Sequence, residues 1–229
     1  MSTTTTLMIQ WLTDPDDGNE VTEAANKYCG KFEIAISNLE PSRDKYSVRD
    51  AILSWALDNN DAQLIYIGSH GFDDRIGPSS TFPSDEEGIR FSELWGWIQE
   101  AHELIRQAMF RDKIARCELI DGVQLDDDEG RIDIWFGACN SANVVSHWHL
   151  TEAAKPWPVC AVASFADKPK QKSVARFLDI LLSQQQIHSI QWPEDTWRML
   201  LHELDQNQPV VFGLNETDND PRWSKAHGY

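Results

Sequence analysis

The chain has few cysteines and no long apolar runs. Many paired cysteines are typical of disulfide-bonded exported proteins, and long apolar runs are typical of membrane proteins. Its four cysteines, Cys29, Cys117, Cys139 and Cys160, form no close pair and no CxxC motif. No segment approaches the ~20 apolar residues of a membrane span. The apolar stretch at 7–12 is too short for a signal-peptide core and has no basic residue before it. A cytoplasmic protein with reduced thiols is therefore expected.

Basic residues are also scarce. The sequence holds 20 Lys and Arg against 37 Asp and Glu, which gives a formal net charge of −17. Binding to a phosphate backbone needs a basic surface, so neither nucleic acid nor an anionic membrane is expected as a partner. The charge is compatible with a cationic protein partner, and a solvated acidic surface is the simpler explanation.

The remaining composition is that of a globular protein. Apolar residues make up 41% of the chain and charged residues 25%, as in ordinary soluble domains. Ten tryptophans add bulk for a core or for an apolar cleft. Because the chain has 229 residues, no internal repeat and no low-complexity linker, it is expected to form a single domain over 1–229.

Apolar runs typical of β-strands alternate with stretches of helical periodicity. The run AQLIYIGS at 62–69 is almost continuously apolar, as in a strand covered on both faces. Within 47–60, Val48, Ile52 and Trp55 recur at helical spacing. The predicted strands are 7–12, 32–39, 62–69, 132–138, 157–166 and 209–215, with a short edge strand at 89–91; the predicted helices are 19–29, 47–60, 92–116, 173–185 and 193–207; and 72–88 is predicted to be a polar loop.

This alternation predicts an α/β fold with a mostly parallel central sheet of about six strands and helices on both faces. In such sheets, ligands and catalytic groups lie just beyond the carboxyl ends of the strands. His70 follows the strand at 62–69, and Cys139 follows the strand at 132–138. If these two strands are neighbours, both side chains project into one crevice.

A thiol and an imidazole in one crevice have the chemistry of a nucleophile and its proton carrier. An ionised thiol is a good nucleophile, so one base can suffice. A nearby imidazole can stabilise the thiolate or give a proton to a leaving amine. Backbone N–H groups can hold the oxyanion that forms on the attacked carbonyl, and those of Gly71 and Cys139 are the obvious donors.

The segments LIYIGSHG and IDIWFGACNS resemble the two catalytic blocks of the caspase-like cysteine peptidases, a group that includes caspases, metacaspases, separases and bacterial CHAT proteases. GIRFSELWGWI at 88–98 also resembles the piece between the blocks in CHAT-type proteins. The resemblance implies a caspase-like three-layer sandwich in which Cys139 is the nucleophile and His70 the general acid/base, with no metal and no cofactor. It further implies a protein or peptide substrate and a bacterial effector role, in defence or signalling, controlled by a partner or ligand.

The chain departs from this family at the position two residues before the cysteine, where Gly137 replaces the Gln of caspases and the Asp of many metacaspases. Neither family's substrate preference can therefore be carried over. In the family, loops after the first strand and after the strand beyond the cysteine line the substrate pocket. Those loops hold the acidic residues Asp14, Asp16, Asp17 and Asp167, which would select Arg or Lys, although DPDD also fits a simple turn.

Other functions stay open. The chain could be a catalytically silent caspase-fold scaffold that binds partners through its acidic surface, or a thiol hydrolase or acyltransferase that cuts no peptide bond. A zinc site made of Cys139, His147 and His149 is disfavoured because the spacing matches no common zinc motif. The acidic run at 126–130 does not have the spacing of a calcium-binding EF-hand loop. Tryptophans such as Trp135 could line an apolar pocket, although core packing is their usual role.

Overall fold

The computed structural model describes residues 5–13, 19–27, 34–38, 44–58, 62–116, 125, 129–130, 132–139, 141, 159–165, 172, 174–176, 178–179 and 209–213. The strands of its larger sheet follow one another in the order β2-β1-β3-β7-β8-β9. Their bounds are β1 Thr5–Gln10, β2 Ile34–Asn38, β3 Ala62–Gly68, β7 Ile132–Phe136, β8 Val159–Phe165 and β9 Pro209–Gly213. Strands β2 to β8 in this order run parallel to their neighbours, and β9 runs antiparallel to β8.

Both faces of the central strands are buried, which explains their almost continuous apolar sequences. Parallel register aligns Leu7 of β1, Ile65 of β3 and Ile134 of β7 on one face. The next residues of these strands, Met8, Tyr66 and Trp135, point to the opposite face and are also buried. Because side chains alternate along a strand, this double burial means that other parts of the chain cover both faces of the sheet.

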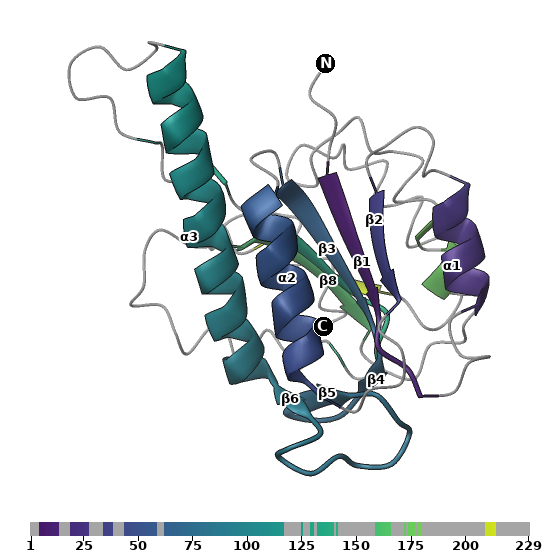
Figure 1. Ribbon diagram of the computed structural model, residues 1–229. Helices are drawn as coiled ribbons and strands as arrows, with labels where there is room; N and C mark the ends of the chain where they lie inside the picture. The colour runs from purple at the N-terminus through teal and green to yellow at the C-terminus, as the bar shows by residue number, and fades with distance from the viewer. Residues whose placement is uncertain are drawn as a thin grey trace.

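Helices α2 (Tyr46–Asp58) and α3 (Phe91–Ala115) cover the face that carries Leu7, Ile65 and Ile134 (Figure 1). On the opposite face, Val174 packs close to Tyr66 and Gly137. Helix α1 (Asn19–Asn26) is tied to the same region by the ion pair of Lys27 with Asp179, whose atoms lie 3.6 Å apart. The predicted α/β class is therefore confirmed. None of the helices in the described ranges is long and apolar enough to cross a membrane.

Most predicted elements lie within a few residues of the observed ones. The strand predicted at 62–69 is Ala62–Gly68, and the helix predicted at 92–116 is Phe91–Ala115. The helix predicted at 173–185 is described as helical at 174–176 and 178–179, and the one predicted at 193–207 lies outside the described residues.

The prediction of a plain polar loop at 72–88 was wrong. This segment contains strand β5 (Arg75–Gly77), which pairs with β4 (His70–Gly71) and β6 (Ile89–Arg90) in a small antiparallel sheet. Ile76 and Ile89 are fully buried and belong to the main core, so their burial holds the small sheet against the domain. Figure 1 shows these short strands beyond the carboxyl ends of the large sheet.

Candidate active site

His70 and Cys139 leave the large sheet side by side. Strands β3 and β7 are neighbours, with Ile67 opposite Phe136 in the register. The Gly137 N–H donates to the Ile67 carbonyl at 2.9 Å, so the pairing continues past the last residue of β7. His70 follows Ile67 at the same interval as Cys139 follows Phe136. The topology therefore brings the two residues to the same end of adjacent strands.

Gly71 packs directly on the main chain of Cys139. A Cβ atom at position 71 would lie 1.6 Å from the Cys139 carbonyl oxygen and 3.0 Å from its nitrogen. Only glycine permits this approach, because the Cβ of any other residue would clash with the Cys139 main chain. The contact fixes the turn after His70 on the turn that holds Cys139.

The turn around Cys139 is held from within the protein. Ala138 is fully buried, and its carbonyl oxygen accepts a hydrogen bond of 2.8 Å from the buried Ser141 hydroxyl. The Ser141 hydroxyl thus supplies a hydrogen-bond donor to the Ala138 carbonyl, which lies beyond the end of β7. Cys139 itself is half-buried and is not part of a disulfide. Its position is thus set by backbone contacts while its side chain reaches a cleft.

The two residues share that cleft. It has a volume of about 410 Å³ and is lined by His70, Gly71, Phe72, Asp73, Ser80, Phe82 and Cys139. His70 is half-buried like Cys139, so both side chains are accessible from solvent. The cleft thus brings together, at the carboxyl ends of parallel strands, the two residue types that nucleophilic catalysis by a thiol uses.

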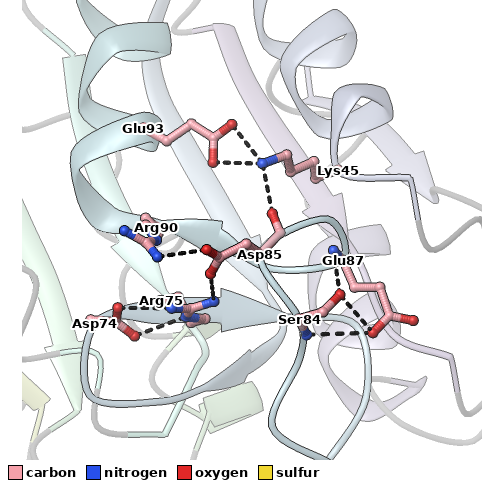
Figure 2. Close-up of polar contacts among 8 residues, drawn as sticks. All are labelled: Lys45, Asp74, Arg75, Ser84, Asp85, Glu87, Arg90 and Glu93. Atoms are coloured by element: carbon pink, nitrogen blue, oxygen red, sulfur yellow. Dashed lines mark hydrogen bonds and ion pairs between the residues drawn. The ribbon is translucent and has the colours of Figure 1, made fainter.

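A buried guanidinium braces the small sheet beside the cleft (Figure 2). The Arg75 side chain is only 7% exposed and forms a two-pronged ion pair with Asp74, at 2.9 and 3.0 Å. Its third nitrogen lies 2.6 Å from a carboxylate oxygen of Asp85. The other oxygen of Asp85 lies 2.7 Å from Arg90. Arg75 of β5 and Arg90 of β6 are therefore joined through the Asp85 carboxylate, which lies in the chain between them.

These contacts shift the ionisation of the groups involved. The hydrogen bond from Arg75 lowers the pKa of Asp74, and hydrogen bonds from Arg90 and Arg75 lower the pKa of Asp85. The hydrogen bond with Asp74 in turn raises the pKa of Arg75. All of these groups therefore stay charged at neutral pH, and the brace is intact there.

Two further contacts connect the brace to the helices. Lys45, just before α2, binds Glu93 of α3 at 2.8 Å and donates to the Asp85 carbonyl at 3.0 Å (Figure 2). Ser84 and Glu87 exchange side-chain and backbone hydrogen bonds, which closes the turn around Asp85. The loop that borders the cleft is thus fixed to the helical layer.

Some residues considered from the sequence lie outside the described parts of the chain. They are the acidic residues Asp14, Asp16, Asp17 and Asp167 and the histidines His147 and His149. Trp135 is 3% exposed within the sheet and is not among the residues that line the cleft of His70 and Cys139. Across the described residues, no group of three or more His, Cys, Asp or Glu could hold a metal ion.

The sequence did not indicate Phe72, Asp73, Ser80 and Phe82 as lining residues. All four fall in the segment that was predicted to be a polar loop. The two phenylalanines are its only aromatic residues, and that isolation was the one available signal.

No family model matches the chain, and no curated protein matches it.

Proposed function

We propose that the chain is a cysteine endopeptidase of caspase-like fold, with Cys139 as nucleophile and His70 as general acid/base. The observation that carries this proposal is the shared cleft, in which an accessible thiol and an accessible imidazole lie at the ends of adjacent parallel strands. The three-layer sandwich with six strands is the architecture that the family resemblance implies, and the strand order supports it.

The reaction needs only groups that the cleft holds. His70 takes the proton of the Cys139 thiol, and the sulfur attacks the carbonyl carbon of the scissile peptide bond. The C–N bond then breaks as His70 gives this proton to the leaving amine, and a thioester remains on Cys139. Water attacks the thioester while His70 takes its proton, and the carboxylic acid product leaves as the thiol is restored. No cofactor takes part.

Backbone N–H groups of Gly71 and Cys139 would hold the oxyanion formed in each attack. The Phe72 N–H donates to the Arg75 carbonyl at 2.9 Å, so Phe72 and Arg75 form a hydrogen-bonded pair of the β4–β5 ladder. Because such pairs alternate along antiparallel strands, the Gly71 N–H points away from β5. Gly71 also lies against the Cys139 main chain, which supports a role for both groups at one oxyanion.

The family resemblance further supports a bacterial effector that cuts a dedicated protein in the cytoplasm. The segment after Cys139 offers no clear processing site, so control by an activating partner or a ligand fits better than self-cleavage.

A catalytically silent scaffold of the same fold is the second candidate. The distal end of α3 extends past the sheet in Figure 1, and its Phe110 and Ile114 are 42% and 52% exposed. The two residues lie one helical turn apart, and a contiguous exposed apolar patch is a feature of surfaces that bind other proteins. A scaffold would need this surface but not a reactive thiol.

Digestion of an unbiased peptide library, read by mass spectrometry, tests the peptidase. The wild type should cut at a defined residue, and Cys139→Ala and His70→Ala should leave every peptide intact. Intact peptides with the wild type, together with turnover of small thioesters, would instead identify a thiol hydrolase or acyltransferase.

Alkylation by iodoacetamide at neutral pH separates the enzyme from the scaffold. An enzyme should be labelled at Cys139 faster than at Cys29, and His70→Ala should slow that labelling. Labelling of Cys139 at the rate of Cys29, whatever residue stands at 70, would support the scaffold.

A further inference from the structure

Four side chains of the cleft, those of Phe72, Asp73, Ser80 and Phe82, have no part in the proposed chemistry. Phe72 and Phe82 form an aromatic wall, and Asp73 lies beside them in the same lining. Phe82 is 65% exposed and its ring contacts that of Phe72, so the two rings form a continuous apolar surface in the cleft. These residues border the reacting groups and are therefore placed to contact a substrate.

The two rings of the aromatic wall contact each other and Arg75 in the absence of a substrate. The rings of Phe72 and Phe82 lie 5.3 Å apart at 73°, which is a stable edge-to-face arrangement. The Arg75 guanidinium lies 5.0 Å from the centre of the Phe82 ring. Arg75 is itself buried and bound by Asp74 and Asp85, so the brace described above also fixes Phe82. A pre-ordered wall binds a side chain at little entropic cost.

Asp73 differs from the acidic residues around it. Asp74 and Asp85 are each neutralised by Arg75 or Arg90. Asp73 is exposed and forms no ion pair or hydrogen bond with any residue in the described part of the chain. The cleft therefore presents one carboxylate that still lacks a cation, next to two aromatic rings.

We propose that the substrate carries a Lys or Arg side chain beside the scissile bond and that Phe72, Phe82 and Asp73 select it. The methylene stem of such a side chain packs on apolar surface, while its charged head pairs with a carboxylate. Neither an acidic nor a purely apolar side chain matches both parts of this lining. The net charge of −17 also draws basic peptides toward the protein. The inference rests on the proposed peptidase function and names its substrate class.

Charged thiol reagents test the cleft independently of peptidase activity. Methanethiosulfonates form a mixed disulfide with a thiol and release methanesulfinate, and they exist with an ethylammonium or an ethylsulfonate group. The measured quantity is the ratio of the two labelling rates at Cys139. Asp73→Asn should lower the cation-to-anion ratio about three-fold, as expected for loss of one nearby charge. Glu86→Gln removes an equal charge from the same loop outside the cleft lining and should leave the ratio unchanged. A ratio that does not respond to Asp73→Asn overturns the inference.

The peptide library completes the test. Wild-type cleavage sites should be enriched in Lys or Arg beside the cut, and Asp73→Lys should shift the enrichment to Asp or Glu. Cleavage with no basic preference, or a preference that Asp73→Lys leaves intact, would also overturn the inference. A cation-selective cleft with no Cys139-dependent cleavage would instead contradict the peptidase proposal, so the two failures are distinguishable.

Discussion

Replacing Gly71 by alanine perturbs the contact that joins the histidine turn to the cysteine turn. The new Cβ would lie 1.6 Å from the Cys139 carbonyl oxygen, and such atoms essentially never approach closer than 3.0 Å. The two main chains must therefore move apart by more than an ångström, because neither contact atom belongs to a flexible side chain. Such overpacking typically costs about 1–3 kcal/mol of unfolding free energy. A displacement of about 1 Å at a reacting pair can lower the rate by about 10²-fold.

Two assays measure the result of Gly71→Ala. Urea unfolding gives the change in stability, and the iodoacetamide rate at Cys139 reports whether His70 still acts on the thiol. Gly96→Ala is the matched control, because a Cβ at position 96 of α3 meets nothing within 4 Å. That control should gain about 0.5–1 kcal/mol from helix propensity and keep the wild-type labelling rate. If Gly71→Ala behaves like Gly96→Ala in both assays, the two turns are not in the contact described here.

Three further predictions concern the core and the brace. Arg75→Met should lower the unfolding free energy at pH 7 by about 1–3 kcal/mol, since it leaves Asp74 unpaired although partly solvated, and urea unfolding measures it. Because the pKa values of Asp74 and Asp85 are lowered in the folded protein, these carboxylates stabilise the fold at pH above the ordinary carboxyl pKa of ~3.9, and this stabilisation is lost as the pH falls through their folded pKa values. The difference in unfolding free energy between wild type and Arg75→Met should therefore narrow in acid. A difference that does not depend on pH would contradict the assignment to Asp74 and Asp85. Burial raises the pKa of the Tyr66 hydroxyl, so above pH ~10 the hydroxyl ionises more readily in the unfolded chain, and this favours unfolding. In an alkaline titration, Tyr66→Phe should therefore unfold at a higher pH than the wild type. An unchanged midpoint of that titration would count against the burial of Tyr66. Ser141→Ala should cost about 1–2 kcal/mol in thermal or urea unfolding because a buried carbonyl loses its donor, and wild-type stability would exclude that bond.

The strands and the place of the cleft could be predicted because their signals are local. The apolar run that became β3 ends at Gly68, and the run that became β7 ends just before Gly137. Small residues at the carboxyl ends of apolar strands mark where a parallel sheet presents its site. The placement of His70 and Cys139 in one cleft follows from those two endings and from the pairing of the strands.

Of the small sheet, only the short strand at Ile89–Arg90 was predicted; the rest could not be, because its cause is non-local. Arg75 is buried although arginine is usually exposed, and its burial depends on a carboxylate at Asp85 that the chain brings back from a later turn. Local sequence shows only a charged residue in a polar segment. The fit of Gly71 on Cys139 likewise joins residues far apart in the sequence, and a glycine beside a histidine does not reveal it.

The same limit applies to the substrate pocket. Sequence reasoning placed the acidic residues of specificity at 14–17 and 167, by family resemblance, and these lie outside the described residues. The carboxylate and the rings that the structure does place in the cleft come from the segment after His70. Their grouping depends on the β4–β5 turn, which the sequence pattern did not indicate.

The most direct test of the proposed function is a comparison of protein N-termini in bacterial cells that express the wild type, Cys139→Ala or His70→Ala at equal levels. We expect discrete new N-termini with the wild type and none with either variant, while all three chains show the same thermal unfolding. Identical sets of N-termini in the three cultures would contradict a peptidase at this cleft, and so would new N-termini that persist without the thiol.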